Sequence, residues 1–216
     1  MNKTDTFLNW WKERNSQEGF YGTATVNDIT VVVHKGVYSP DPTCTHATTM
    51  MTHILSDFEG KRVLDIGTGT GFLAIYAAKK GAKKVTAVDI QPESIENALE
   101  NVRAFALGEI IEVLVSDVFA SVTGQYDVII ANLPFMDPEW TEMNSIAVET
   151  NGRFFAQLEA HLAPGGKAYI SCSSWGDIAA TESMIANSKL VCKTYSEAAR
   201  NAIWYVYELT RPEPVA

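Results

Sequence analysis

Three short segments of the sequence combine glycine, acidic and amide residues that could bind a small molecule. The first is DIGTGTG, residues Asp65–Gly71, which stands between the strand-like run KRVL and the helix-like run FLAIYAAKK. Glycines let the backbone turn sharply and approach a ligand without a Cβ clash, and a helix that follows presents free N–H groups. Because the repeat lies between a predicted strand and a predicted helix, it indicates a loop that binds a nucleotide-type cofactor.

The second segment type is an acid that closes an apolar run. Asp89 closes VTAVD and Asp117 closes IIEVLVSD. A carboxylate has two acceptor oxygens, so Asp89 could take both hydroxyls of a ribose and Asp117 could accept from an adenine amine. Each acid could instead cap a helix, Asp89 ahead of Pro92 and Asp117 ahead of Val118–Val122. Together with the glycine loop, the ribose role of Asp89 is the favoured interpretation.

The third segment is the tetrapeptide NLPF, residues Asn132–Phe135, which closes the apolar run YDVIIA. An asparagine oxygen and a backbone carbonyl at this point could hold the two hydrogens of an amine, and an aromatic ring could pack on a planar group. Asparagine and proline are also common in turns. On local chemistry alone, the segment is better explained as a turn.

The elements that must position these segments alternate along the chain from Lys61. Strands are predicted in KRVLDIG, KKVTAVDI, IIEVLVSD, YDVIIANL and KAYISCS, with a final pair in LVCKTYS and AIWYVYEL, and helices over 71–80, 92–106, 151–162 and 175–187. This alternation predicts an α/β fold, a mostly parallel seven-stranded sheet with helices on both faces and an antiparallel last strand. The final pair is expected to be joined by a four-residue polar connection. Ligands of such sheets bind beyond the carboxyl ends of the strands, where the three segments fall.

The first 60 residues follow a different pattern. A short helix is predicted over Thr6–Lys12, and two β-branched runs around Asn27-Asp28 predict a hairpin. A loop over Gly36–His46 and a helix over Thr48–Asp57 come next. We therefore expect an N-terminal extension of helix, hairpin and substrate-side loop over residues 1–60, and a cofactor-binding domain over 61–216.

Composition limits the classes of function. The 216 residues are 46% hydrophobic and 20% charged, as in an ordinary folded domain. Their net charge of −9 disfavours binding to DNA or duplex RNA. Three cysteines without a CxxC pair indicate a reducing compartment, and four scattered histidines give no reason to expect a metal site. Without a signal-like N-terminus or a run of about 20 apolar residues, a cytoplasmic location and no membrane contact are expected.

The motifs VLDIGTGTG, AVDI, SDVF and ANLPF occur in the order and at the spacing of class I S-adenosylmethionine-dependent methyltransferases, and the chain resembles that family from Lys61 to Leu209. Asp65 ahead of G-x-G-x-G resembles the methyltransferase loop rather than the nicotinamide one. The resemblance implies a Rossmann-like three-layer sandwich and S-adenosylmethionine as the cofactor.

The resemblance also implies a role for each matching position. Four residues would contact the methionyl part of the cofactor, namely Asp65, Gly67, Gly69 and Gly71. The nucleoside would be held by Asp89 at the ribose, Ile90 beside the adenine, Asp117 at its amine and Val118 near its ring. The cofactor carboxylate would lie near Thr45 and Thr48, and the methyl acceptor would face Asn132, Leu133, Pro134 and Phe135.

The methyl acceptor is where the resemblances disagree. NLPF resembles the N-P-P-[YF] signature of enzymes that methylate planar or exocyclic nitrogens, among them release-factor glutamine methyltransferases and adenine amine methyltransferases, but Leu133 replaces the usual proline. GVYSP also resembles the glutamine family. CTHATTMMTHIL instead resembles the G-T-x-H-x-T-T segment of ribosomal-protein lysine methyltransferases, with Cys44 where glycine is usual. His46 in this segment is more simply interpreted as a loop histidine than as a catalytic one.

The sequence thus predicts methyl transfer to a nitrogen of a protein side chain or of a small-molecule amine or amide, with an RNA or DNA adenine amine as the alternative acceptor. Two other functions remain open. An NAD(P)-dependent oxidoreductase shares the strand–glycine–helix–acid plan, although no Tyr-x-x-x-Lys pair is present and NLPF would have no evident role. A non-catalytic cofactor-binding subunit is suggested by Leu133 alone. The oligomeric state is not predicted.

Overall fold

A computed structural model describes residues 22–43, 45–134 and 141–212, with the side chains of 141–146 outside this description. The predicted helix over Thr6–Lys12 and the site candidate Phe135 lie outside the described residues, as does Cys44.

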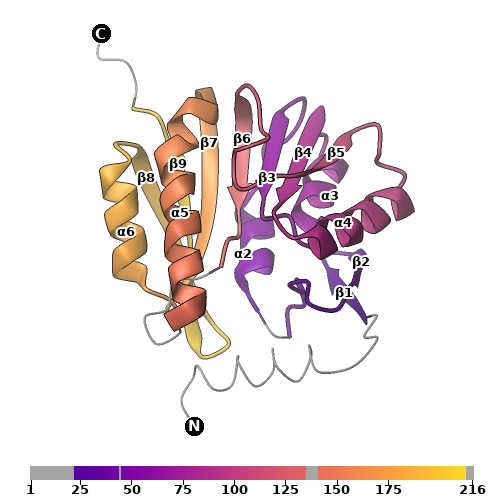
Figure 1. Cartoon of the computed structure of the whole chain (residues 1–216), viewed down its shortest axis with the longest axis horizontal. Coiled ribbons are helices and arrows are strands. Elements are labelled where there is room, and N and C mark those ends of the chain that lie inside the picture. The colour runs from indigo at the N-terminus through magenta and orange to yellow at the C-terminus, as the bar shows by residue number, and fades with distance from the viewer. Residues whose placement is uncertain (1–21, 44, 135–140, 213–216) are drawn as a thin grey trace.

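The described chain is built on a sheet of seven strands (Figure 1). In spatial order these are β5 (Ile111–Val115), β4 (Lys84–Asp89), β3 (Arg62–Ile66), β6 (Tyr126–Ala131), β7 (Leu162–Ser173), β9 (Ala202–Thr210) and β8 (Val191–Ala199). Neighbours from β5 to β7 pair in parallel, whereas β9 is antiparallel to both β7 and β8. This arrangement confirms the predicted fold class. The strand order reverses between β3 and β6, so the carboxyl ends of these two strands form the switch point at which ligands of such sheets bind.

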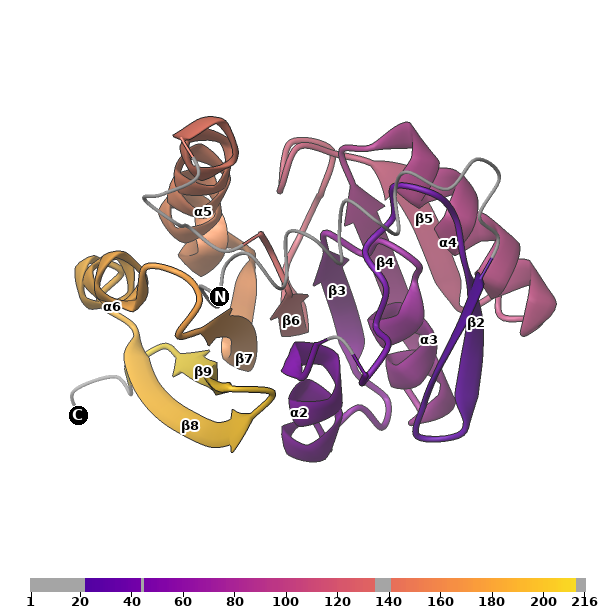
Figure 2. The same ribbon diagram turned by 90° about the horizontal axis from the view of Figure 1, so that it is seen from below.

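Helices cover both faces of the sheet (Figure 2). On one face lie α2 (Ala47–Ile54), α3 (Phe72–Lys79) and α4 (Pro92–Ala104), whose apolar side chains share a buried cluster with Val85 and Trp204. On the other face lie α5 (Thr141–His161) and α6 (Ile178–Asn187), which share a second cluster with Ile129 and Ile170. Because each face has its own apolar cluster, the central strands β3, β4 and β6 are buried on both sides, which explains their nearly continuous apolar sequences.

The structure corrects four predicted element limits. The helix predicted over 151–162 begins at Thr141, and the one predicted from residue 175 begins after Asp177, whose carboxylate accepts from Ala180 N at 2.9 Å and caps α6. The helix predicted over Thr48–Asp57 ends at Ile54. The predicted four-residue connection is a two-residue turn, since β8 continues to Ala199 and β9 starts at Ala202.

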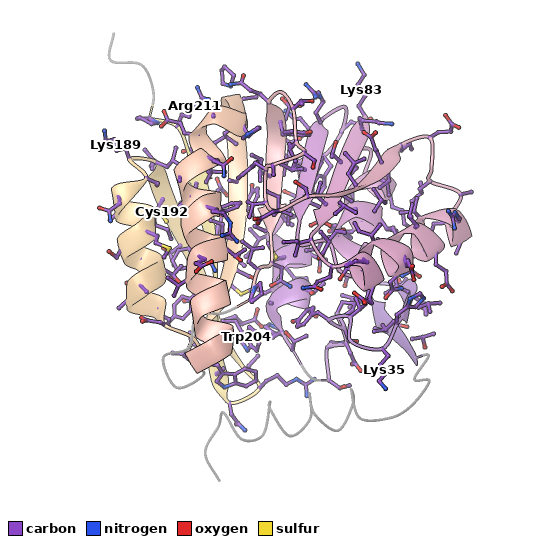
Figure 3. The ribbon with its side chains drawn as sticks, viewed as in Figure 1. Lys35, Lys83, Lys189, Cys192, Trp204 and Arg211 are labelled. Carbon is purple, nitrogen blue, oxygen red and sulfur yellow. The ribbon has the colours of Figure 1, made fainter. Side chains whose placement is uncertain are left out.

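Arg211 anchors the segment that follows β9. Its Nη2 donates to the carbonyls of Glu159 at 2.5 Å and Leu162 at 2.6 Å, so it satisfies carbonyls where α5 ends and β7 begins. Figure 3 shows Arg211 near one end of the strands and Trp204 near the opposite end. Trp204 is paired with Ser173, the last residue of β7. It therefore lies at the end of the sheet where the parallel strands have their carboxyl ends.

The predicted hairpin is confirmed as β1 (Gly22–Val26) and β2 (Ile29–Val33). Its turn residues Asn27 and Asp28 have φ values of 47° and 62°, as a two-residue hairpin turn requires. The hairpin is held by two asparagines of α4. Asn101 Oδ1 accepts from Val32 N at 2.8 Å and its Nδ2 donates to Val32 O at 2.8 Å.

Asn97, one helical turn before Asn101, extends the same contact by accepting from His34 N at 2.9 Å and donating to Val32 O at 2.9 Å. Asn101 Nδ2 also donates to Thr70 O at 2.9 Å, inside the glycine loop. Both asparagines are at most 1% exposed. The two amide side chains bond to the backbone of the hairpin segment as a neighbouring strand would, and Asn101 also bonds to the glycine loop. The hairpin and the glycine loop are therefore fixed relative to each other through α4.

Replacing Asn101 with alanine should therefore lower the free energy of unfolding by about 3 kcal/mol, because the part-buried N–H of Val32 and the buried carbonyl of Thr70 each lose a hydrogen-bond partner. Urea unfolding measures the change. The control is Glu96→Ala, an exposed position on the same helix. A loss of stability no larger than that of the control would contradict the docking role.

Candidate active site

The glycine loop lies against the end of β4. The N–H groups of Gly67 and Thr68 donate to Val88 O at 2.8 and 3.0 Å, and Gly69 N donates to Asp89 Oδ2 at 3.0 Å. Gly67, Gly69 and Gly71 have φ values of 71°, 54° and 77°, in the left-handed region that favours glycine. The loop thus turns sharply between β3 and α3 while its backbone faces the ends of β4 and β6.

Gly71 also allows α3 and α4 to approach closely. A Cβ on Gly71 would lie 3.2 Å from both Cα and Cβ of Ala98. We expect Gly71→Ala to lower the free energy of unfolding by about 2–4 kcal/mol, from the left-handed backbone and this contact together. Gly60→Ala is the matched control, because Gly60 has φ +69° but nothing within 4 Å of its Cβ position. Equal losses for the two variants, measured by urea unfolding, would show that the contact with Ala98 adds no strain.

Asp65 is buried under the loop and is 1% exposed. Its Oδ2 accepts from Thr68 Oγ1 at 2.6 Å. Burial raises the pKa of Asp65 from 3.8 to about 7, the hydrogen bonds from Thr68 and from the backbone of Ala74 oppose this rise, and the nearby charge of Asp89 adds to it. The carboxylate is therefore placed where a cationic group of a ligand would stabilise its charged form.

The raised pKa gives a pH dependence of definite sign. The native state binds the Asp65 proton more tightly than the unfolded chain, so stability is fully present below about pH 4 and falls as pH rises to about 7. Between about pH 5.5 and about pH 8, we expect urea unfolding to show a loss on the order of 2 kcal/mol in the wild type relative to Asp65→Asn, which cannot ionise. Parallel pH profiles for the two proteins would contradict a raised pKa at this residue.

Asp89 ends β4 with both carboxylate oxygens directed to backbone N–H groups, those of Gly69 at 3.0 Å and Gln91 at 2.9 Å. The N-cap of α4 is Gln91, so Asp89 is not the helix cap that the sequence left open as an alternative. Ile90, the next residue, is 54% exposed. Val115 of β5, which is paired with Asp89, is 57% exposed. The end of β4 therefore combines hydrogen-bond acceptors with uncovered apolar side chains, a combination that suits a nucleoside.

Asp117 and Val118 follow β5 in a tight turn. Residues 118–121 form a turn rather than a helix, so Asp117 has no helix to cap there. Its Oδ1 lies 3.2 Å from Nε of Arg153 on α5. Val118 is buried with φ +51°, an unfavourable conformation for a β-branched residue, and its carbonyl accepts from Ser116 Oγ at 3.0 Å. Backbone strain of this kind concentrates at ligand sites.

The tetrapeptide that the sequence predicts to face the methyl acceptor begins where β6 ends, and Leu133 in it lies beside the glycine loop. The side chain of Leu133 is buried against Gly67, with Leu133 Cδ2 only 3.1 Å from the place a Cβ on Gly67 would occupy. Asn132 Oδ1 accepts a hydrogen bond from Ser171 Oγ of β7. Pro134 O accepts from Asn151 Nδ2 of α5 at 3.3 Å. Residues 132–134 are thus held by β7 on one side and by α5 on the other.

Thr48 lies in the first turn of α2, and Thr45 lies two residues before that helix. Thr45 accepts from Tyr38 OH at 2.5 Å, and a Cβ on Gly69 would lie 3.9 Å from Tyr38 O. Thr45 is therefore joined to the loop through Tyr38, whereas Thr48 is buried in the first turn of α2. His46 is the N-cap of α2 without a side-chain cap bond, and its Nε2 lies 3.1 Å from Glu197 Oε2.

Three residues that touch the site were not singled out from the sequence: Ser171, Asn151 and Arg153. Ser171 could have been noticed as a polar residue near the end of a predicted strand. Asn151 and Arg153 carried no such signal, because the predicted helix began at Asn151 and its orientation could not be known.

Within residues 22–43, 45–134 and 141–212, no helix is both long and apolar enough to cross a bilayer. In the same part of the chain, no three His, Cys, Asp or Glu residues gather in a way that could hold a metal ion.

Comparison with known proteins fits this geometry. The family model of the methyltransferase small domain matches residues 28–207. A relative from Methanocaldococcus jannaschii, named as a candidate protein N5-glutamine methyltransferase, is 33% identical over 160 residues, which are 69% of this chain and 78% of the relative. The crystal structure of ribosomal protein L11 methylase from Lactobacillus delbrueckii subsp. bulgaricus shows 26% identity and a TM-score of 0.60, with 87% of this chain and 98% of that chain covered.

A 16S rRNA N2 methyltransferase of T. thermophilus, solved in complex with AdoMet and guanosine, has the same fold at 22% identity and a TM-score of 0.67, with 89% of this chain and 50% of that chain covered. The family match is incompatible with the oxidoreductase alternative. The chain therefore belongs to the methyltransferase small domain family and is a class I S-adenosylmethionine-dependent methyltransferase.

Proposed function

We propose that this methyltransferase transfers its methyl group to a nitrogen of a protein side chain. The observation that carries this proposal is the contact of Leu133 with Gly67, because together with the pairing of Ala131 and Ile66 it brings the chain at residues 132 and 133 beside the glycine loop. A methyl donor on that loop and an acceptor at the tetrapeptide would then be adjacent. The relative from Methanocaldococcus jannaschii, named for glutamine N5 methylation, supports a planar amide nitrogen as the acceptor.

The described residues fit the cofactor. Asp89 offers two acceptor oxygens, which in a complex would exchange backbone N–H partners for ribose hydroxyls. Exposed Ile90 and Val115 supply an apolar surface for the adenine, and Asp117, held by Arg153, supplies an acceptor for its amine. The uncapped start of α2 beside Thr45 is suited to a carboxylate, because the first N–H groups of a helix attract anions.

When bound, S-adenosylmethionine would supply an activated methyl group, with S-adenosylhomocysteine as the leaving group and one proton lost from the nitrogen to water. The protein then has to hold the nitrogen in line at roughly 3–3.5 Å from the methyl carbon. An amide nitrogen is a weak nucleophile because its lone pair is delocalised. Asn132 Oδ1 and the Leu133 carbonyl would accept hydrogen bonds from the N–H groups of the acceptor nitrogen. These hydrogen bonds would favour a lone pair localised on that nitrogen. These bonds strengthen as positive charge develops on nitrogen, so they stabilise the transition state more than the ground state.

The choice of a protein acceptor rests on charge. A net charge of −9 opposes binding to a phosphate backbone and favours basic protein partners. The test is transfer of tritium from S-[methyl-³H]adenosylmethionine to the protein and RNA fractions of a cell extract. We expect label that is released by protease and not by ribonuclease, and labelling about 10²–10³-fold slower with Asn132→Ala. Label in RNA alone would assign a nucleic-acid acceptor. Binding of S-adenosylmethionine without labelling of any fraction would support the non-catalytic alternative.

A further inference from the structure

The side chain of Asn132 makes a specific contact across the sheet. β6 and β7 run parallel with Ala131 paired to Ile170, so Asn132, which directly follows β6, lies beside Ser171 of β7. Ser171 is 5% exposed, and its hydroxyl donates to Asn132 Oδ1. The backbone of Ser171 is also paired with Val206 of β9. Ser171 is therefore a buried hydroxyl on a rigid strand, directed at the one side chain that the proposed mechanism uses as an acceptor.

The orientation of the Asn132 amide matters for that mechanism. The terminal torsion of asparagine is broad and roughly two-fold, so a free side chain can present either Oδ1 or Nδ2 to a ligand. Only Oδ1 can accept a hydrogen bond from an acceptor nitrogen. The backbone of the tetrapeptide is already held by Asn151 through Pro134 O, so the torsion of Asn132 is the freedom that still has to be restricted.

The hydrogen bond from Ser171 restricts it. A carbonyl oxygen has two lone pairs, so Oδ1 can accept from Ser171 on the sheet side and from a substrate N–H on the other side. We propose that Ser171 is a positioning residue, which fixes the Asn132 amide with its oxygen available to the methyl acceptor. This inference rests on the proposed N-methyltransferase function. Ser171 acts through Asn132 and touches neither the methyl donor nor the reacting atoms.

Nuclear magnetic resonance can test this before the acceptor is known. In protein labelled with ¹⁵N at asparagine and saturated with S-adenosylhomocysteine, the Asn132 side-chain amide is identified by its loss in Asn132→Asp. We expect one sharp pair of Nδ2 proton signals in the wild type. Ser171→Ala should broaden them and bring their shifts toward those of free asparagine, and Ser171→Thr should restore them. The control is Ser183→Ala, at an exposed position on α6. Ser171→Cys, a weaker donor of similar size, replaces the alanine variant if that variant fails to fold.

Unchanged Asn132 signals in Ser171→Ala, with S-adenosylhomocysteine still bound, would overturn the positioning role and leave the proposed function intact. Absence of S-adenosylhomocysteine binding in the wild type would instead refute the cofactor assignment. Once labelled transfer is measurable, Ser171→Ala should lower kcat about tenfold, with the Kd for S-adenosylmethionine unchanged. In the Asn132→Asp background both side-chain oxygens are acceptors, so the same substitution should have little effect. An equal tenfold loss in both backgrounds would also contradict the inference.

Discussion

Replacing Asn132 with alanine is expected to lower kcat for methyl transfer about 10²–10³-fold while changing the Kd for S-adenosylmethionine less than about threefold. The side chain lies at the end of β6, and in the mechanism it accepts a hydrogen bond that strengthens only as charge develops on the acceptor nitrogen. Loss of the side chain should therefore raise the free energy of the transition state and leave the affinity for the cofactor almost unchanged. Steady-state transfer of tritiated methyl groups gives kcat, and calorimetry gives the Kd.

The matched control is Asn187→Ala, an exposed asparagine at the end of α6, which should leave both quantities unchanged. The alanine variant also leaves the Ser171 hydroxyl without its asparagine partner, so thermal unfolding should be recorded for each protein. If cofactor binding weakened by the same factor as kcat, Asn132 would belong to the cofactor pocket and the acceptor role would be wrong.

Replacing Asp89 with alanine is expected to have the opposite signature. The Kd for S-adenosylmethionine should rise roughly 30- to 1,000-fold, from the loss of about 2–4 kcal/mol of hydrogen bonding between a charged acceptor and two ribose hydroxyls. At saturating cofactor, kcat should change far less than in the Asn132 variant. Calorimetric titration with S-adenosylmethionine measures the change in affinity directly.

Two further variants separate recognition of the ribose from other roles of Asp89. Glu93→Ala removes one negative charge from the first turn of α4 and should leave the Kd unchanged. Asp89→Asn keeps one acceptor oxygen for Gly69 N and should show an intermediate affinity. Unchanged cofactor binding in Asp89→Ala would rule out the ribose assignment.

The features that followed from the sequence are those that local chemistry determines. The apolar runs ending in Asp65, Asp89 and Asn132 are strands because they are buried on both faces of a parallel sheet, and this burial leaves a continuous apolar pattern. Asn27-Asp28 gave the hairpin because both residues tolerate positive φ. The glycine loop could be placed because strand, glycine repeat and helix follow one another directly.

The features that were missed depend on contacts between distant segments. Asn97 and Asn101 look like ordinary polar residues of a helix, yet their partners in the hairpin lie more than 60 positions earlier in the chain. Ser171 contacts Asn132 only because β6 and β7 are neighbours in one register. The predicted connection after β8 is longer than the observed turn, because nothing in the sequence indicates that Arg200 adopts φ +54°.

The central claim is that the carboxyl ends of β3, β4 and β6 form a site for S-adenosylmethionine. Calorimetric titration of the purified protein with S-adenosylmethionine, S-adenosylhomocysteine and the nicotinamide dinucleotides tests it most directly. The structure leads us to expect binding of both sulfur ligands at micromolar concentration and none of the dinucleotides. Dinucleotide binding with no heat from either sulfur ligand would contradict the assignment of this site.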